Sequence, residues 1–175
     1  MGPALVTTYA LTVDTEVRDL RAADHLLRTL AAELALPEGA FGCTHLVRGE
    51  RPRVVLSLTL PSEPLLRTAQ ERLTARGHEV APGSPDAVGR AVIYPGVSAL
   101  TGTLTVADLL TRSAIDRVTV LGTPGRPTPD TRLVTGDHVR PQWQDGELVL
   151  TAMPAVGGAL VPFEVPDPTP CCADH

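Results

Sequence analysis

Hydrophobic and polar positions alternate along residues 5–13, and many of these side chains are β-branched, a pattern typical of a β-strand. Asp14 or Thr15 is predicted to cap the helix that follows, because a side-chain oxygen there can accept a backbone N–H of the first turn. Pro37 and Gly39 are predicted to end this helix. It carries one apolar stripe at spacings of three and four. The stripe consists of Leu20, Ala23, Leu27, Leu30 and Leu34.

Two further strands and a second helix follow the first helix. The strands are predicted at 41–47 and 54–60, where apolar residues again alternate with polar ones. The second helix is predicted to begin after Ser62, a good N-cap residue, and to end at Gly77, which suits the left-handed position after a helix. A short strand is predicted to start at 78–80.

The order of these elements, strand–helix–strand–strand–helix–strand, predicts an α+β unit over residues 1–82. This order is that of the split-βαβ, ferredoxin-like plan. Right-handed crossover connections leave few other topologies for the same order. Because that plan serves many unrelated functions, it does not by itself indicate what the protein does.

The second half of the chain has a different character. Residues 83–102 are rich in proline and glycine and predict an irregular connection, with one short strand at 91–94. Residues 103–165 predict a helix plus a β-meander. The helix is expected over 106–113, where Thr-x-x-Asp forms a capping box, and the dipeptide at 145–146 is Asp-Gly, a strong hairpin signal. The strands are expected near 117–121, 138–143, 147–151 and 159–165.

Composition excludes several classes of function. All fifteen basic residues are arginine, so chemistry that needs a lysine, such as Schiff-base formation or a P-loop, is excluded. The formal net charge is −5 and aromatic residues make up 3% of the chain, which argues against nucleic-acid binding. No apolar run reaches the roughly 20 residues of a membrane span, and the first residues do not resemble a signal peptide. We therefore expect a cytoplasmic protein that does not bind a membrane.

The polar residues of the second half suggest one candidate binding site. Arg132, Asp137, His138 and Arg140 lie close together in the sequence, and we expect a site between the two halves that gathers several of them with Arg126. Adjacent residues in a strand point to opposite faces, so Asp137 and His138 cannot orient one another. His138 would act as a general base only with a partner from elsewhere in the chain.

The cysteines and two of the histidines suggest a second site. Residues 166–175 form a proline-rich tail that ends in a cluster of thiols and an imidazole. Thiolate and imidazole are ligands of zinc and copper(I), and two residues of the strand at 41–47 would complete a tetrahedral site. The donors of this hypothetical site are Cys171, Cys172, His175, Cys43 and His45. The alternative is a buried Cys43, an exposed His45 and a frayed terminus.

One face of the first sheet is predicted to be covered, because it holds small side chains and no charge, unlike a sheet face in water. The C-terminal meander or the same face of a second copy of the chain is the expected cover. The residues of this face are Val6, Thr8, Ala10, Thr12, Val55, Ser57 and Thr59.

These observations lead to three hypotheses of function. The leading one is a non-catalytic, regulatory module that binds a small molecule or a protein, needs no cofactor, and can form a homodimer. The second is a protein that handles zinc or copper, or thiol redox chemistry, through the tail. The third is a small enzyme with an Arg/Asp/His site, for which the chain shows none of the common catalytic motifs.

Overall fold

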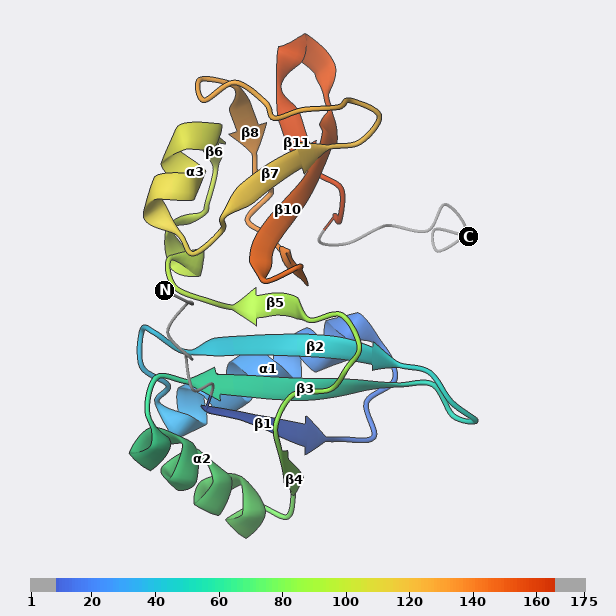
Figure 1. The fold of residues 1–175 in the computed structure, drawn as a ribbon, viewed down its shortest axis with the longest axis vertical. Helices are drawn as coiled ribbons and strands as arrows, with labels where there is room; N and C mark the ends of the chain where they lie inside the picture. The colour runs from blue at the N-terminus through green and yellow to red at the C-terminus, as the bar shows by residue number, and fades with distance from the viewer. Residues whose placement is uncertain (1–8, 166–175) are drawn as a thin grey trace, which may run out of the picture. The chain divides into compact units, whose positions relative to one another are not determined.

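The protein is a mixed α and β structure that divides into two compact units, Met1–Pro95 and Gly96–His175. The computed structural model describes residues 9–165. Within this range there are three α-helices, and most strand pairs are antiparallel (Figure 1). No helix in the described range is long and apolar enough to cross a membrane.

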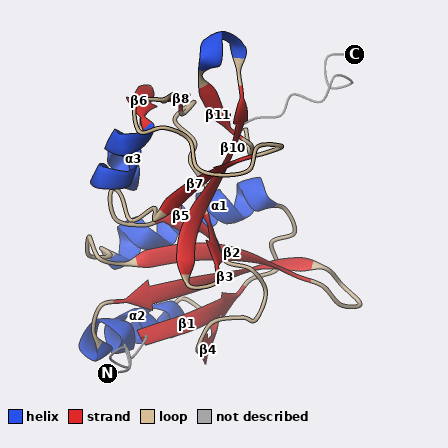
Figure 2. Ribbon diagram, turned by 45° about the horizontal axis from the view of Figure 1, so that its top comes forward, coloured by secondary structure: helices blue, strands red, loops and turns tan. Residues whose placement is uncertain are grey.

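The N-terminal unit is one antiparallel sheet with two helices on one of its faces (Figure 2). The strands lie in the order β4-β1-β3-β2-β5, and every neighbouring pair is antiparallel. The elements in chain order are β1 (Tyr9–Asp14), α1 (Leu20–Leu34), β2 (Phe41–Val47), β3 (Arg53–Leu60), α2 (Glu63–Ala75), β4 (Glu79–Pro82) and β5 (Arg90–Ile93).

Aliphatic side chains from both helices and from one face of the sheet form the core of this unit. Leu27 of α1, Leu73 of α2 and Leu56 of β3 are fully buried. Burying a leucine side chain stabilises a fold by roughly 1.5–3 kcal/mol. A Cβ atom at Gly42 of β2 would lie 3.1 Å from Cδ1 of Leu27, so the helix packs against the strand where a side chain is missing. The predicted apolar stripe of the first helix is therefore the face that it buries.

The start of α1 differs from the prediction. Its N-cap is Asp19, whose Oδ1 accepts a hydrogen bond from the Ala22 amide at 2.8 Å. The predicted cap, Asp14 or Thr15, is wrong because Asp14 is the last residue of β1 and pairs with Arg53 at 3.1 Å. At the other end, Ala35 adopts the left-handed conformation with φ at 49°. The helix thus stops before the proline and glycine that were expected to end it.

A buried ion pair joins three elements of the N-terminal unit. The Arg90 guanidinium on β5 donates to both oxygens of Asp24 on α1, at 2.6 and 3.0 Å, and to Oγ1 of Thr44 on β2 at 3.1 Å. The side chains of Arg90 and Asp24 are 8% and 5% exposed. A bidentate ion pair of this kind is strong and fixes the orientation of both side chains. It therefore holds β5 beside β2 and against the helix.

The C-terminal unit is built around one long strand, β10. Its strands lie in the order β9-β10-β11-β8-β6, and β7 also pairs with β10. The elements in chain order are η1 (Val97–Ala99), β6 (Thr103–Thr105), α3 (Val106–Arg112), β7 (Arg117–Val120), β8 (Arg132–Val134), β9 (Gln142–Gln144), β10 (Glu147–Pro154), η2 (Val156–Gly158) and β11 (Leu160–Pro162). β7 runs parallel to β10, and β8 runs parallel to β11. The unit is therefore not the simple meander that was expected.

Local signals in the C-terminal unit gave correct predictions. Oγ1 of Thr105 accepts a hydrogen bond from the Asp108 amide at 3.1 Å and caps α3. Asp145 and Gly146 have φ angles of 50° and 82°, the pair of positive values that a type I′ hairpin turn requires. They join β9 to β10. These features depend on a few neighbouring residues, which explains why they are visible in the sequence.

We expect Asp24→Ala to lower the free energy of unfolding by about 3–5 kcal/mol, because the substitution leaves the buried Arg90 charge without its carboxylate. Chemical denaturation would measure the change. The control is Glu63→Ala, which breaks an exposed pair with Arg67 on α2 and should change stability by about 0.5 kcal/mol. Equal effects of the two substitutions would contradict the structural role assigned to the buried pair.

Candidate functional site

A cavity in the C-terminal unit lies beside β10, at the point where one neighbouring strand ends and another begins. Val149 pairs with both Arg117 of β7 and Gln142 of β9, so these strands lie along opposite edges of β10. Ala152 likewise pairs with both β7 and β11. One edge of β10 is therefore shared by β9 and β11, and residues 150–151 lie between their ladders.

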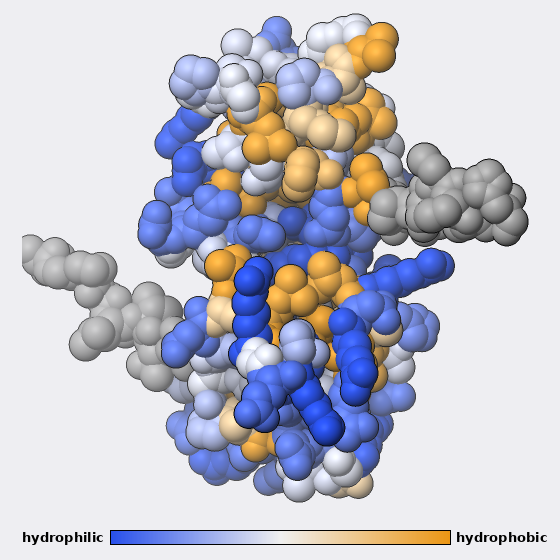
Figure 3. Space-filling model, turned by 90° about the vertical axis from the view of Figure 1, so that its right-hand side faces the viewer, coloured by the Kyte–Doolittle hydropathy of each residue, from blue (hydrophilic) through white to orange (hydrophobic). Residues whose placement is uncertain are grey.

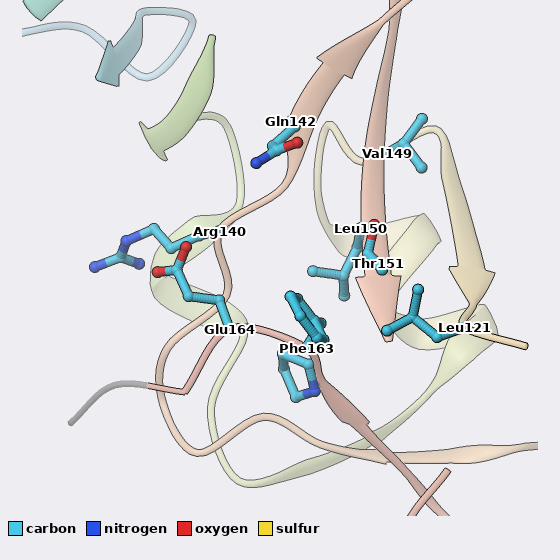
Figure 4. A pocket seen from close by; sticks show the side chains of 9 residues that line it. Leu121, Arg140, Gln142, Val149, Leu150, Thr151, Phe163 and Glu164 are labelled. Atoms are coloured by element: carbon cyan, nitrogen blue, oxygen red, sulfur yellow. The ribbon is translucent and has the colours of Figure 1, made fainter. Parts of the chain in front are cut away.

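The cavity at this position has a volume of about 330 Å³ (Figure 4). Its wall combines apolar side chains with a guanidinium, an amide, a hydroxyl and a carboxylate. The lining residues are Leu121, Arg140, Gln142, Val149, Leu150, Thr151, Pro162, Phe163 and Glu164. Leu121 and Phe163 are 46% and 58% exposed, and Figure 3 shows apolar side chains among polar ones on the surface of this unit.

Arg140 and Gln142 reach the cavity from one extended stretch of chain. They flank Pro141, which is buried, and residues two apart in an extended chain project from the same side. Gln142 also lies directly opposite Val149 of β10. The stretch thus presents a guanidinium and an amide, both hydrogen-bond donors, on the same side.

Glu164 reaches the cavity from the chain that follows β11, and it binds His138. The distance from Nε2 of His138 to Oε2 of Glu164 is 2.7 Å, and the two side chains are 13% and 33% exposed. A carboxylate accepts, so Nε2 donates. In Figure 4 the Glu164 and Arg140 side chains lie alongside one another. The contact of His138 with Glu164 fixes the position of the carboxylate at the edge of the cavity.

The structure places the sequence-predicted binding residues in different surroundings. His138 contacts Glu164, and Arg140 lines the cavity alongside Glu164, so both side chains lie at the cavity edge. Asp137 instead accepts a hydrogen bond from the Gly102 amide at 2.9 Å, a structural contact, and Arg132 lies exposed on β8 outside the cavity lining.

Sequence reasoning missed four polar or aromatic residues of the lining. Three separate segments, which only the sheet brings together, supply Gln142, Thr151, and the adjacent pair Phe163 and Glu164. Glu164 lies 26 residues after His138, a spacing that matches no motif. One weak signal existed: the chain has two phenylalanines in all, and Phe163 stands at an exposed position.

The metal hypothesis is tested only in part. Cys171, Cys172 and His175 lie outside the described residues. Cys43 and His45 share one face of β2, and both are buried. Among residues 9–165 no group of three or more histidine, cysteine or acidic side chains is placed to hold a metal ion.

His45 makes hydrogen bonds through both ring nitrogens. Nδ1 lies 3.0 Å from the carbonyl oxygen of Ala87, and Nε2 lies 2.7 Å from Oγ of Ser57. A carbonyl oxygen can only accept, so Nδ1 carries a hydrogen and, in the neutral ring, Nε2 accepts from the serine hydroxyl. The neutral ring is thus fully satisfied, and neither nitrogen is open to a metal in this arrangement.

The Ser57–His45 contact resembles an activated nucleophile, in which histidine accepts the proton of a serine hydroxyl. However, Ser57 and His45 are 3% and 4% exposed. A substrate could not reach the hydroxyl without movement of the chain above it. The contact therefore serves structure in this state: it orients the His45 ring, whose Nδ1 donates to the Ala87 carbonyl and ties segment 83–89 to the sheet.

Segment 83–89 crosses the sheet face that was expected to be covered (Figure 1). The Gly83 amide donates to the carbonyl oxygen of Ala10 at 2.9 Å, and Oγ1 of Thr12 donates to the carbonyl oxygen of Gly83 at 2.7 Å. Ala10 and Val55 are 8% and 3% exposed. This cover from the same unit was not among the expected ones. Val6 and Thr8 of the predicted face lie outside the described residues.

Comparisons with protein-family models, with curated proteins and with solved structures give no match for this chain. Any functional conclusion therefore depends on the geometry of the described residues.

We expect the protein to lose stability as the pH falls below about 6.5, the ordinary pKa of histidine, and His45 to cause part of the loss. Burial lowers the pKa of His45, against the opposing effect of the hydrogen bonds to the backbone at Ala87 and Val88. In the window between the lowered pKa and 6.5, the unfolded chain binds a proton that the folded chain does not, so stability rises with pH.

His45→Gln should flatten this pH dependence, because glutamine keeps hydrogen-bonding groups but does not titrate. Unfolding curves collected from about pH 8 to about pH 5 would measure it. His25→Gln, at an exposed position on α1, is the control and should keep the wild-type profile. If His45→Gln also keeps that profile, the pH dependence does not come from His45.

Proposed function

We propose that the protein is a non-catalytic binding module whose C-terminal unit holds a small ligand in the cavity beside β10. The observation that carries this proposal is the composition of the cavity wall. Small-molecule sites are concave, largely apolar and equipped with a few polar groups that fix orientation, with volumes of roughly 300–1,000 Å³. A cavity of about 330 Å³, with leucine, valine, proline and phenylalanine beside four polar side chains, fits this description.

The chemistry of the wall supports binding rather than catalysis. The nine lining residues include no serine, cysteine, histidine or lysine, and the groups that could act as nucleophile or base are the Thr151 hydroxyl and the Glu164 carboxylate. The hydroxyl in the wall belongs to Thr151, and the nearby imidazole of His138 is directed to Glu164. Such a set can orient a ligand through hydrogen bonds and charge.

The strands that support the cavity favour a binding site that is already formed in the absence of ligand. Leu150 and Val149, at its base, are 2% and 1% exposed and belong to a strand with partners along both edges. Phe163 is held by its amide, which donates to the Thr151 carbonyl at 3.0 Å. The five lining residues that lie on strands form the more rigid part of the site, which lowers the entropy lost on binding.

We further infer that the N-terminal unit follows the ferredoxin-like plan. The order of elements from β1 to β4, the strand order β4-β1-β3-β2 and the burial of both helices against one face support this inference. Strand β5 extends that plan beyond β2. Because the plan hosts many functions, the proposal for the cavity does not depend on it.

We expect small-molecule fragments to bind this cavity in the full chain. In an amide-detected NMR screen, the binding fragments should shift the signals of Leu121, Leu150, Thr151 and Phe163 together. Thr151→Trp should abolish these shifts, because the indole fills the cavity. Val156→Trp is the matched control, since it adds the same side chain at a position that is 99% exposed and outside the lining.

Two results would contradict the proposed function. One is a screen in which no fragment shifts the four signals. The other is a set of shifts that persists in Thr151→Trp, which would place the binding elsewhere in the chain. Thermal unfolding of both variants would show whether either substitution has damaged the fold.

A further inference from the structure

We propose, building on the proposed function of the cavity, that its ligand is an uncharged molecule in which a carboxamide is attached to a compact apolar body. The cavity of about 330 Å³ combines apolar side chains with polar groups of two kinds, charged and uncharged. The charged groups already have partners within the protein, whereas the uncharged groups have none among the described residues. This division favours a neutral ligand that both donates and accepts hydrogen bonds.

The charged groups at the cavity edge are engaged within the protein and do not select an ion of either sign. His138, Arg140 and Glu164 all take part in interactions, among them the contact of 2.7 Å between Nε2 of His138 and Oε2 of Glu164. The lining contains one guanidinium and one carboxylate, which lie alongside one another (Figure 4). A ligand carboxylate would meet Glu164 as well as Arg140, and a ligand ammonium would meet both with the signs reversed. Either ion would thus lose hydration without gaining an unengaged partner of opposite charge.

Two uncharged side chains of the wall have hydrogen-bonding groups that the protein does not use. The Gln142 amide and the Thr151 hydroxyl line the cavity, and within the described part of the chain neither side chain makes a hydrogen bond. The glutamine amide offers two N–H donors and a carbonyl acceptor, and the hydroxyl can donate or accept. Both groups therefore match a ligand of mixed hydrogen-bonding polarity.

The interrupted ladder along β10 adds a backbone donor to the cavity. Backbone groups of successive residues in a strand point to alternate edges. The Leu121 amide donates to the Ala152 carbonyl on the β7 edge. Thr151 therefore directs its backbone groups to the opposite edge, where its carbonyl accepts from the Phe163 amide at 3.0 Å. The Thr151 N–H points into the gap between the β9 and β11 ladders, and no backbone carbonyl among residues 9–165 accepts from it. A ligand carbonyl would satisfy this donor.

The rest of the wall is apolar and partly open. Leu150 is 2% exposed, whereas Leu121 and Phe163 keep 46% and 58% of their surface exposed. The hydrocarbon part of a ligand would remove this apolar surface from water, which is favourable. An aromatic ring can in addition pack against the ring of Phe163. The cavity thus fits an aryl- or alkyl-substituted carboxamide, whose carbonyl accepts from the Thr151 N–H and whose N–H donates to the Gln142 carbonyl.

Three probes of matched size test the charge of the ligand on the full chain: the neutral amide 3-phenylpropanamide, the anion 3-phenylpropanoate and the cation 3-phenylpropylamine. Calorimetry and the NMR signals of the cavity would measure their affinities. We expect the amide to bind about ten-fold or more tightly than either ion, because a charge in this cavity is desolvated without gaining a partner. Tighter binding of either ion would overturn the proposal.

A fourth probe, 4-phenylbutan-2-one, separates a carboxamide from any neutral ligand, because it keeps the carbonyl and lacks the N–H groups. We expect this ketone to bind about five-fold more weakly than the amide, which is the effect of one hydrogen bond. Both probes should move the NMR signal of the Thr151 amide proton downfield, since both offer it a carbonyl acceptor. Equal affinities of the two probes would contradict the assignment of a carboxamide.

Gln142→Leu tests the side chain that carries the inference. It should weaken binding of the amide about five-fold and remove the preference for the amide over the ketone. The preference is the decisive measurement, because any change in apolar packing affects both probes alike. The matched control is Gln144→Leu, the same substitution at an exposed position of β9 outside the cavity lining, and it should keep the preference. Melting temperatures would confirm that each variant is folded.

The outcomes separate the ligand class from the proposed function. If other fragments bind the cavity but 3-phenylpropanamide binds no more tightly than the ions or the ketone, the ligand class is wrong and the binding function stands. The same holds if Gln142→Leu keeps the preference for the amide. If no fragment of any charge shifts the cavity signals, the proposed function fails, and the ligand class fails with it.

Discussion

The buried pair of Asp24 and Arg90 is the interaction on which the arrangement of the N-terminal unit depends. It holds β5 at the β2 edge of the sheet, whereas β4, the preceding strand, lies at the opposite edge. The chain must therefore cross the whole sheet between these two strands. Because α1 and α2 cover one face, segment 83–89 crosses the other. The ion pair thus fixes the edge at which β5 lies, and the two helices determine which face the connection covers.

The composition of the covered face follows from this crossing. A segment that lies directly on a sheet requires small side chains beneath it, which accounts for alanine, serine and threonine at these positions. Backbone groups of the segment also need partners, since a buried polar group without one is destabilising. Ala10, Thr12 and His45 provide these partners. The neutral state of His45 is a consequence of its burial under the segment.

The cavity of the C-terminal unit also arises from topology. Because β9 and β11 share one edge of β10, the ladder along that edge is interrupted, and side chains from several segments line the gap. A continuous partner strand would fill the same space with backbone. Strand β7 pairs with β10 along the other edge, residues 150–151 included. The proposed binding function is thus a property of how strands are shared and not of a local motif.

The sequence by itself determined the elements that depend on neighbouring residues. Alternation located β2 at 41–47, the leucine stripe gave the buried face of α1, and Asp145-Gly146 gave the hairpin turn. It also indicated candidate binding residues in a region containing His138 and Arg140, which lie at the edge of the cavity. Tertiary structure decided the rest. The partners of Arg90, the cover of the sheet face and the place of Glu164 depend on contacts between residues that lie 66, 71 and 26 positions apart, respectively. Periodic patterns in the sequence do not indicate such contacts. The contacts depend on strand order and pairing, and other sequences with the same local signals could form a different strand order.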